Sequence, residues 1–114
     1  MVNTAHQGRG VEYRVRDHLI AHGYEVIRAA ASKGPADLIG IKQGQVLFLN
    51  VKRTALPGPD ERRELVRLAA LLPGVGVPVI ARRGHAGRGL RLERLLTADR
   101  AASARIPFEI DEVR

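Results

Sequence analysis

The pattern of apolar residues first predicts an amphipathic helix over residues 10–22. Val11, Val15 and Leu19 recur at helical spacing and form a single apolar stripe, as expected for a helix that turns by ~100° per residue. Gly23 follows the last turn and is well placed as its C-terminal stop. The helix therefore has one face to bury against another layer.

Three apolar runs after this helix predict strands over residues 25–31, 37–41 and 45–53. Gln43 and Gly44 make a turn between the second and third runs, which indicates a β-hairpin. Side chains alternate across a strand, so each strand of this hairpin presents one set of residues to either face of the sheet.

The second half of the chain predicts a crossover connection. Residues 59–72 carry a helical apolar face and begin with a proline suited to a first helical turn. Another apolar run, residues 77–82, is expected to form a strand parallel to the one that precedes this helix. We expect the tail to hold a short strand at 89–92, a helix around 93–101 and an irregular end. The order αβββαβ predicts an α/β fold with a central mixed β-sheet.

Composition narrows the class of protein. The chain has 114 residues and a mass of 12.5 kDa, which predicts a single domain over 1–114, with a core at about 8–83 and a basic loop and C-terminal extension at 84–114. The sequence contains no Cys, which excludes disulfides, thiolate zinc sites and cysteine nucleophiles. Neither a bilayer-spanning apolar run nor a signal-peptide pattern is present. We therefore expect a cytoplasmic protein with no membrane partner.

The charge balance favours a polyanionic partner. Nineteen Lys and Arg residues against twelve Asp and Glu give a formal net charge of +7, and a small domain this basic is a candidate nucleic-acid binder. A GC-rich genome is an alternative source of so many arginines. Aromatic residues make up only 4% of the chain, which disfavours a single-strand binder built on stacking platforms.

Polar residues interrupt the expected hairpin at one end. Phe48, Asn50 and Lys52 share one face of the third strand, and two polar side chains on a buried face need partners. The hairpin brings Asp37, at the start of the preceding strand, to the same end as Asn50 and Lys52. Asp37 could alternatively serve only the Gly-Pro turn before it.

Glu12 borders the apolar stripe of the first helix. An acid in this position is either paired with a base, such as Arg16 one turn further on, or directed at a site beside the sheet. On the same helix His18 and His22 have a spacing that can bind zinc. No third ligand follows them, so a helix-surface or helix-end role is the simpler interpretation.

These residues together resemble the PD-(D/E)xK pattern of restriction-endonuclease-like nucleases. Asp37 is followed, after twelve residues, by the triplet NVK at 50–52. The segment RGVE at 9–12, the helix after it, GYEVIRAAAS, LFLNVK and a second helix extend the resemblance to archaeal-type Holliday junction resolvases, including virus-encoded relatives, over about 8–83. The resemblance implies a restriction-endonuclease-like α/β fold in a protein of a prokaryotic or virus-infected cell.

The resemblance also implies a metal-dependent hydrolysis of phosphodiester bonds. Carboxylates that hold one or two Mg²⁺ ions allow the phosphate charge to be neutralised and a water to be activated, and Mn²⁺ is expected to substitute. A lysine beside the metal orients the water and stabilises developing charge. No small-molecule cofactor is implied. The matching positions are, for the metal, Glu12, Asp37, Asn50 and the Val51 carbonyl, and, for catalysis, Lys52 and Ser32.

Position 50 departs from the pattern, which requires Asp or Glu where this chain has Asn. The proline is also displaced by one residue, since Pro35-Ala36-Asp37 stands where Pro-Asp is usual, but the turn is retained. An amide removes one negative charge from the metal site, so the chain is expected to be impaired or inactive in cleavage. It is either a natural divergent relative or an engineered inactive version of an acid-containing enzyme, and the engineered change is the simpler explanation.

Resolving a four-way junction needs two symmetric cuts, so the resemblance implies a homodimer with two sites acting on branched DNA. Recognition should rest on phosphate contacts and junction shape rather than on base edges. One alternative is another nuclease of the superfamily, acting on flaps, nicks or replication intermediates. The other is a DNA-binding module without catalysis, which Asn50 favours.

Basic residues on several segments are candidates for DNA contact. The arginines at 62, 63 and 67 could form a DNA-facing helix edge or a solvated face neutralised by neighbouring acids. Other arginines cluster around the Gly-rich loop at 84–89. The DNA contacts that we expect are Arg9, Lys33, Arg53, Arg82, Arg83 and Arg88.

Overall fold

Two helices and six strands are present in the part of the chain that the computed structural model describes, residues 4–29, 34–84 and 89–110. The N-terminal part has the predicted order of helix, three strands, helix and strand. The elements are α1 (Thr4–Ala21), β1 (Glu25–Arg28), β2 (Leu38–Lys42), β3 (Gln45–Val51), α2 (Pro59–Ala70), β4 (Gly76–Arg83), β5 (Leu90–Leu95), a 3-10 turn (Ala102–Ala104) and β6 (Arg105–Pro107).

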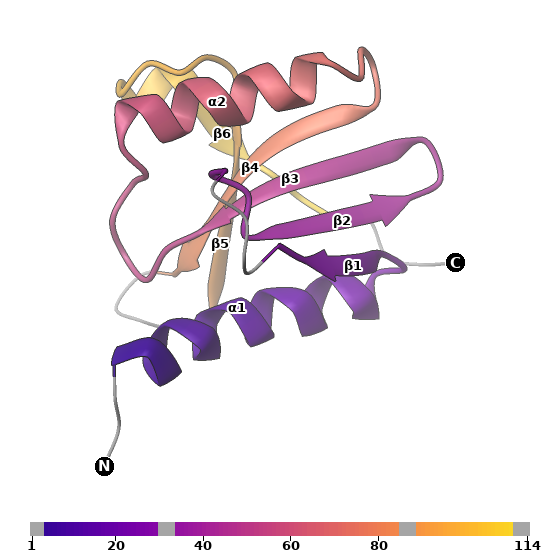
Figure 1. Ribbon diagram of the computed structural model, residues 1–114, viewed down its shortest axis with the longest axis vertical. Helices are drawn as coiled ribbons and strands as arrows, with labels where there is room; N and C mark the ends of the chain where they lie inside the picture. Colours follow the sequence, from indigo (N-terminus) through magenta and orange to yellow (C-terminus); the bar gives the residue numbers. More distant parts are fainter. Residues whose placement is uncertain (1–3, 30–33, 85–88, 111–114) are drawn as a thin grey trace.

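The strands form one mixed sheet in the order β1-β2-β3-β4-β5-β6 (Figure 1). β3 and β4 are parallel, and the other neighbouring pairs are antiparallel. α2 makes the connection from β3 to β4. The β2–β3 hairpin pairs Lys42 with Gln45, so its turn is the expected Gln43-Gly44 pair, with Gly44 at φ 79°. The predicted mixed sheet, hairpin and parallel crossover are therefore confirmed.

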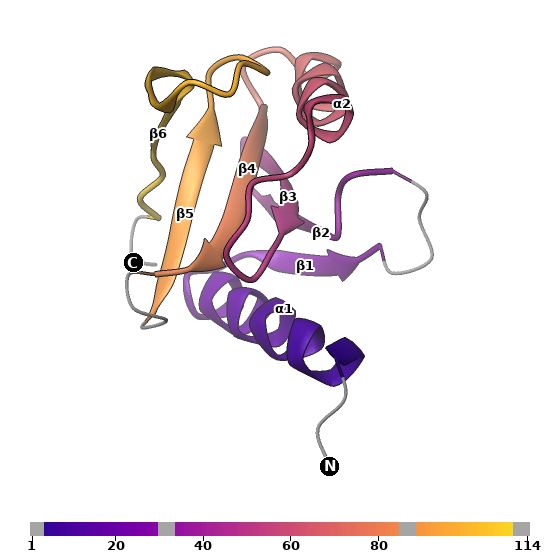
Figure 2. The same cartoon turned by 90° about the vertical axis from the view of Figure 1, so that its left-hand side faces the viewer.

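α1 and α2 pack on opposite faces of this sheet (Figure 2). From α1, the predicted stripe of Val11, Val15 and Leu19 is buried against Leu47 of β3 and Val79 of β4. Neither helix, over the described residues, is long and apolar enough to cross a membrane. Burial of the stripe fixes α1 below the sheet and leaves the other face to α2.

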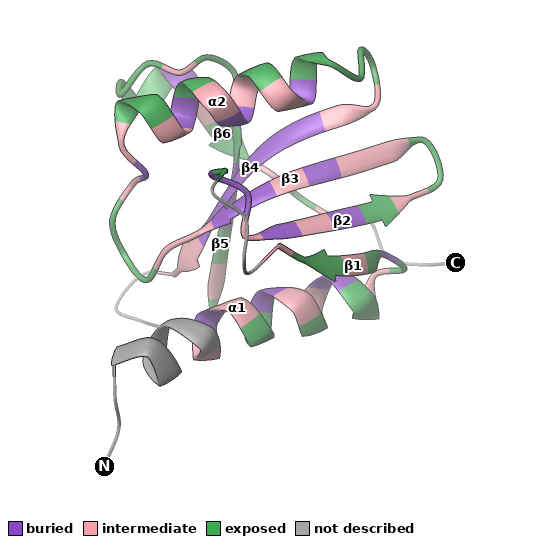
Figure 3. Ribbon diagram, in the orientation of Figure 1, coloured by how far each residue is buried: buried purple, intermediate pink, exposed green. Residues whose placement is uncertain are grey.

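The face under α2 contains the polar end of β3. Leu65 of α2 packs with Ile80 of β4, and Phe48 of β3 lies partly buried beside them. Because side chains alternate along a strand, Asn50 points to the same face as Phe48. Figure 3 shows that the buried residues concentrate on β3 and β4, at the centre of the sheet. The polar end of β3 therefore lies in the interior, close to the beginning of α2.

The expected helix at 93–101 is wrong. β5 continues to Leu95 and pairs antiparallel with β4, so that Glu93 lies opposite Ile80. The short 3-10 turn and β6 complete the tail, where an irregular end was expected. Pairing with the free edge of β4 and burial of alternate residues of β5 outweigh the helical propensity of this segment.

The other differences concern the ends of elements. α1 begins at Thr4, earlier than the expected residue 10. β1 ends at Arg28 rather than residue 31, since its pairing with β2 stops opposite Leu38, and part of the expected strand lies outside the described residues. β3 ends at Val51 rather than residue 53. The strands next to the polar cluster are thus shorter than their apolar runs suggest.

A buried carboxylate ties the last three strands together. The Glu93 side chain is 8% exposed and forms ion pairs with Arg82 at 2.7 Å, Arg91 at 3.3 Å and Arg105 at 3.4 Å. These bases come from β4, β5 and β6. A buried charge is tolerated only when it is paired and hydrogen-bonded, so this cluster holds the C-terminal strands in register.

Gly76→Ala is expected to destabilise the fold by about 1–3 kcal/mol, the usual cost of overpacking. A Cβ on Gly76 would lie 2.3 Å from the backbone oxygen of Ala69, where α2 approaches β4. Urea unfolding measures the change. Gly10→Ala is the matched control, because a Cβ there meets nothing within 4 Å inside α1, and it should be neutral or stabilising. Equal midpoints for the two variants would contradict this packing.

Candidate functional site

The end of the β2–β3 hairpin brings Asp37 next to the end of β3. The Asp37 backbone N–H donates to the Leu49 carbonyl at 2.8 Å, and its carboxylate accepts the Val51 N–H at 2.7 Å. The Lys52 N–H in turn donates to Ala81 of β4 at 2.9 Å. Two strand pairings therefore fix the relative positions of Asp37, Asn50 and Lys52, as the hairpin pattern predicts.

The Asp37 carboxyl lies in an electronegative, partly desolvated environment. Burial is the main cause that raises its pKa above the ordinary value, and the nearby carboxylates of Glu12 and Glu61 raise it further. The Val51 N–H and the Lys52 ammonium act in the opposite direction. A cation placed here would relieve the repulsion among the acids.

Glu12 reaches this region from α1 and is only 16% exposed. Its carboxylate accepts a hydrogen bond from Arg28 of β1 at 2.6 Å. The expected partner, Arg16, is instead paired with Asp17 at 3.0 Å. Glu12 raises the pKa of Asp37, so both alternatives hold in part: the acid is paired with a base, though a different one, and it also lies beside the polar cluster.

Asn50 is 1% exposed, and only the nitrogen of its amide has hydrogen-bond partners among the described residues. Its Nδ2 atom donates to the Pro35 carbonyl at 2.6 Å and lies 3.2 Å from Glu61 Oε2. Two acceptors around one amide branch assign it as the nitrogen. Oδ1 is buried without a hydrogen-bond partner among the described residues. A buried oxygen of this kind is a candidate cation ligand.

Glu61 is the residue of this cluster that the sequence did not single out. An acid in the first turn of α2 interacts favourably with the helix dipole, a role that needs no functional site. In the structure its Oε2 atom lies 3.2 Å from Asn50 Nδ2 and 3.5 Å from Lys52 Nζ, and Oε1 accepts the Gly58 N–H at 3.3 Å. Nothing in the spacing from Lys52 to Glu61 indicates this contact.

Oxygen atoms make up the donor set around Asp37. The Glu12 and Asp37 carboxylates, Asn50 Oδ1 and the Val51 carbonyl are hard ligands, the kind that Mg²⁺ prefers. No three His, Asp or Glu side chains within the described ranges are arranged to hold a metal ion. The partnerless Asn50 oxygen and the raised pKa of Asp37 nevertheless fit a divalent cation at this end of the sheet.

The structure separates the expected DNA contacts. Arg82 is engaged internally with Glu93 and with the Thr54 carbonyl at 3.0 Å, which disfavours it as a phosphate contact. Arg83 is half-buried, and Arg53 is exposed. Three other expected site residues, Ser32, Lys33 and Arg88, lie outside the described residues. Arg9 belongs to α1, but its side chain is outside the described part of the structure.

The basic run on α2 is mostly a solvated, neutralised face. Arg63 pairs with Asp60 and Arg67 pairs with Glu64. Arg62 is buried instead, and donates to the Pro57 carbonyl at 2.6 Å and to the Ala98 carbonyl at 2.9 Å. These contacts favour the structural alternative over a DNA-facing edge.

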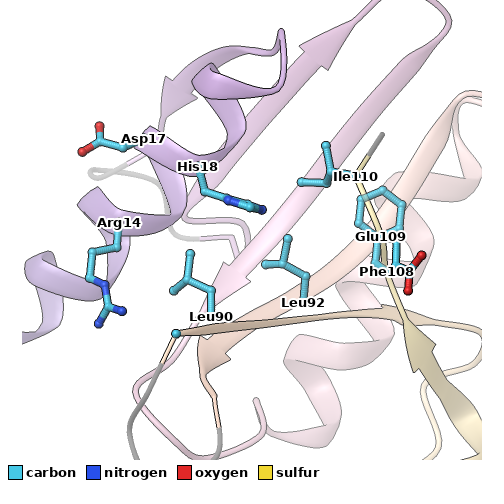
Figure 4. Close-up of a pocket in the computed structure, with 9 residues that line it drawn as sticks. Arg14, Asp17, His18, Leu90, Leu92, Phe108, Glu109 and Ile110 are labelled. Atoms are coloured by element: carbon cyan, nitrogen blue, oxygen red, sulfur yellow. The ribbon is translucent and has the colours of Figure 1, made fainter. Parts of the chain in front are cut away.

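The histidine pair on α1 is used within its own helix. His22 Nδ1 donates to the His18 carbonyl at 2.8 Å. His18 also borders a groove of about 730 Å³ between α1 and the C-terminal strands, which Figure 4 shows. Leu90, Leu92 and Phe108 form its apolar wall. None of the polar cluster around Asp37 lines this groove.

Comparison with known protein families finds a match that covers the hairpin end. The family model described as archaeal Holliday junction resolvase (Hjc) matches residues 3–58. This range spans α1 and the first three strands, and it contains Glu12, Asp37, Asn50 and Lys52. No curated protein matches the chain. Over residues 3–58 the chain thus matches the archaeal Holliday junction resolvase family, and its six-stranded mixed sheet with two helices is consistent with the restriction-endonuclease-like fold of these PD-(D/E)xK nucleases.

Proposed function

We propose that this protein is a Mg²⁺-dependent endonuclease that cuts four-way DNA junctions as a homodimer. The observation that carries the proposal is the Asp37 carboxylate held on the Val51 N–H beside the partnerless oxygen of buried Asn50. The match to the resolvase family over residues 3–58 supports a nuclease that binds Holliday junctions. The metal, the dimer and the catalytic state of the chain are the parts that we propose.

Each residue of the cluster has a distinct part in this proposal. Asp37, Glu12, Asn50 Oδ1 and the Val51 carbonyl hold Mg²⁺, or Mn²⁺ in its place. A bound divalent cation supplies phosphate charge neutralisation and a water of lowered pKa. Lys52, whose side chain is 35% exposed, orients that water and stabilises the charge that develops on the phosphate.

The ion pair between Arg28 and Glu12 must open before the Glu12 carboxylate can bind a metal ion. The pair is joined at 2.6 Å, and the Arg28 side chain is 37% exposed. The Arg28 side of this ion pair is open to solvent, which screens the interaction. Arg28 is therefore free to turn toward a phosphate once the Glu12 carboxylate is taken by a cation.

Asn50 leaves the ligand set one negative charge short of the family pattern, so we propose that the chain cleaves more slowly than one with an acid there. The same residue favours a second function, a junction-binding module without catalysis. In that case the basic surface alone, with a net charge of +7, accounts for DNA binding.

Cleavage of a four-way junction and of a plain duplex with the same arm sequence tests the proposal. With Mg²⁺ present, we expect symmetric cuts in the junction and none in the duplex. Size-exclusion chromatography should show a dimer. Equal cleavage of both DNAs, or of flaps and nicks alone, would favour another nuclease of the superfamily. Junction binding without cleavage at any concentration of Mg²⁺ or Mn²⁺ would favour the binding module.

A further inference from the structure

Glu61 places a carboxylate beside the amide that stands where the family has an acid. The Glu61 Oε2 atom is 3.2 Å from Asn50 Nδ2 and 3.5 Å from Lys52 Nζ. Independently, Asn50 Oδ1 is buried and has no partner among the residues described. The nitrogen of the amide is thus held by two acceptors, while its oxygen is left over.

We propose that Glu61 and Asn50 act as a pair in place of the missing acidic ligand, an inference that rests on the proposed metal-dependent function. Glu61 is a positioning residue in this pair: it holds Asn50 Nδ2, which leaves Oδ1 as the amide atom available to a cation. A carboxylate that accepts the amide N–H also polarises the amide and strengthens its oxygen as a ligand. The negative charge lost at position 50 is then replaced in part, one hydrogen bond away, so cation binding is weaker than with an acidic ligand but is not lost.

The surroundings of Asn50 fit an amide better than a carboxylate. The Pro35 carbonyl oxygen and Glu61 Oε2 face the position of Nδ2. An aspartate oxygen in that position would be repelled by both. The same two acceptors that would oppose an acid in the metal-free protein satisfy the amide nitrogen, which leaves Oδ1 as a weaker, neutral ligand.

Glu61 also links the pair to Lys52. Its Oε2 atom contacts both the amide of Asn50 and the ammonium of Lys52, so the two side chains share one acceptor. The capping contact of Glu61 Oε1 with the Gly58 N–H fixes the other half of the side chain. A purely structural role in capping α2 needs only an acceptor oxygen, whereas the proposed role needs the negative charge.

Calorimetric titration with Mn²⁺, without DNA, tests whether metal binding needs the negative charge of Glu61. Glu61→Gln removes the charge and keeps one acceptor oxygen, which can still cap the Gly58 N–H, while an NH2 group replaces the oxygen that faces Asn50 Nδ2. We expect it to weaken Mn²⁺ binding by at least about tenfold, as for other residues that support a metal ligand. Glu64→Gln is the matched control on the same helix, since Glu64 pairs with Arg67, and it should bind Mn²⁺ as the parent does. Equal Mn²⁺ affinity of Glu61→Gln and Glu64→Gln would overturn the proposal.

The double variant Asn50→Asp/Glu61→Gln exchanges the amide and the carboxylate at constant net charge. It should bind Mn²⁺ at least as tightly as the parent, and Mn²⁺ affinity as weak as that of Glu61→Gln alone would also overturn the pairing. Glu61-dependent Mn²⁺ binding in a chain that cuts no DNA would support the pair while refuting the resolvase function. Junction cleavage by the parent, together with unchanged Mn²⁺ affinity in Glu61→Gln, would support the resolvase function and refute the pairing of Glu61 with Asn50.

Discussion

Asp37→Asn is expected to lower the rate of junction cleavage by more than about a hundredfold, which exceeds the cost of losing a residue that merely supports a metal ligand. The amide keeps an oxygen that can accept the Val51 N–H, so the hairpin end is preserved. Junction affinity should be unchanged or slightly higher, because a negative charge leaves the phosphate-binding surface. Single-turnover cleavage and gel-shift titration of the same junction measure the two effects.

The same substitution should stabilise the metal-free fold at neutral pH. The pKa of Asp37 is raised, chiefly by burial, so between its ordinary and its raised pKa the folded state binds more protons than the unfolded state. Stability therefore falls as the pH rises through that window, and the ionised carboxylate opposes folding above it. Asp37→Asn removes this cost. Urea unfolding in EDTA should show a gain at neutral pH that disappears below the ordinary carboxyl range.

These two readouts separate catalysis from folding. A variant that is more stable, still binds junctions and no longer cuts them has lost a functional group and not its fold. Cleavage by Asp37→Asn at the parent rate would refute the assignment of Asp37 as a metal ligand. A loss of stability at neutral pH would refute the argument from the raised pKa.

Asn50→Asp is expected to raise cleavage at limiting Mg²⁺ by at least about tenfold, because cation affinity depends on the charge of the ligands. DNA affinity should not rise in parallel. Asn50→Glu should help less, since its extra methylene group moves the carboxylate. Cleavage as a function of Mg²⁺ concentration measures this for the parent and both variants, with Lys52→Ala in the Asn50→Asp background as the inactive control.

The Asn50→Asp substitution should destabilise the metal-free protein. The new carboxylate would face the Pro35 carbonyl and Glu61 in a buried position, and an uncompensated buried charge costs about 3–5 kcal/mol. Mg²⁺ should restore that stability. A parent chain that already cuts as fast as Asn50→Asp would show that Asn50 causes no impairment. Failure of both acidic variants to cut any DNA would refute the nuclease function.

The convergence of Asp37 with Asn50 and Lys52 could be predicted because a hairpin with a two-residue turn fixes its own register. Counting outward from Gln43-Gly44 places Asp37 opposite the end of β3, and the structure has that pairing. The crossover was predictable for a similar reason, since a strand, a helix and a strand of these lengths connect parallel neighbours.

Contacts that depend on the path of a loop could not be predicted. Glu61 reaches Asn50 only because the segment after Lys52 returns the start of α2 over the end of β3, and no periodicity specifies that path. Arg28 pairs with Glu12 across two elements, whereas helical spacing suggested Arg16. The segment at 93–101 has helical propensity, but the open edge of β4 and the arginines around Glu93 decide its conformation.

The ion pairs around Glu93 change how binding to DNA should respond to salt. The steepness with which affinity falls as salt rises reports the number of phosphates that the protein neutralises. Arg82 and Arg105 are only 12% and 9% exposed and share the Glu93 carboxylate, so neither guanidinium is presented to a phosphate. Such bases displace no cations from the DNA, so the salt sensitivity of junction binding should correspond to fewer charges than the nineteen in the composition.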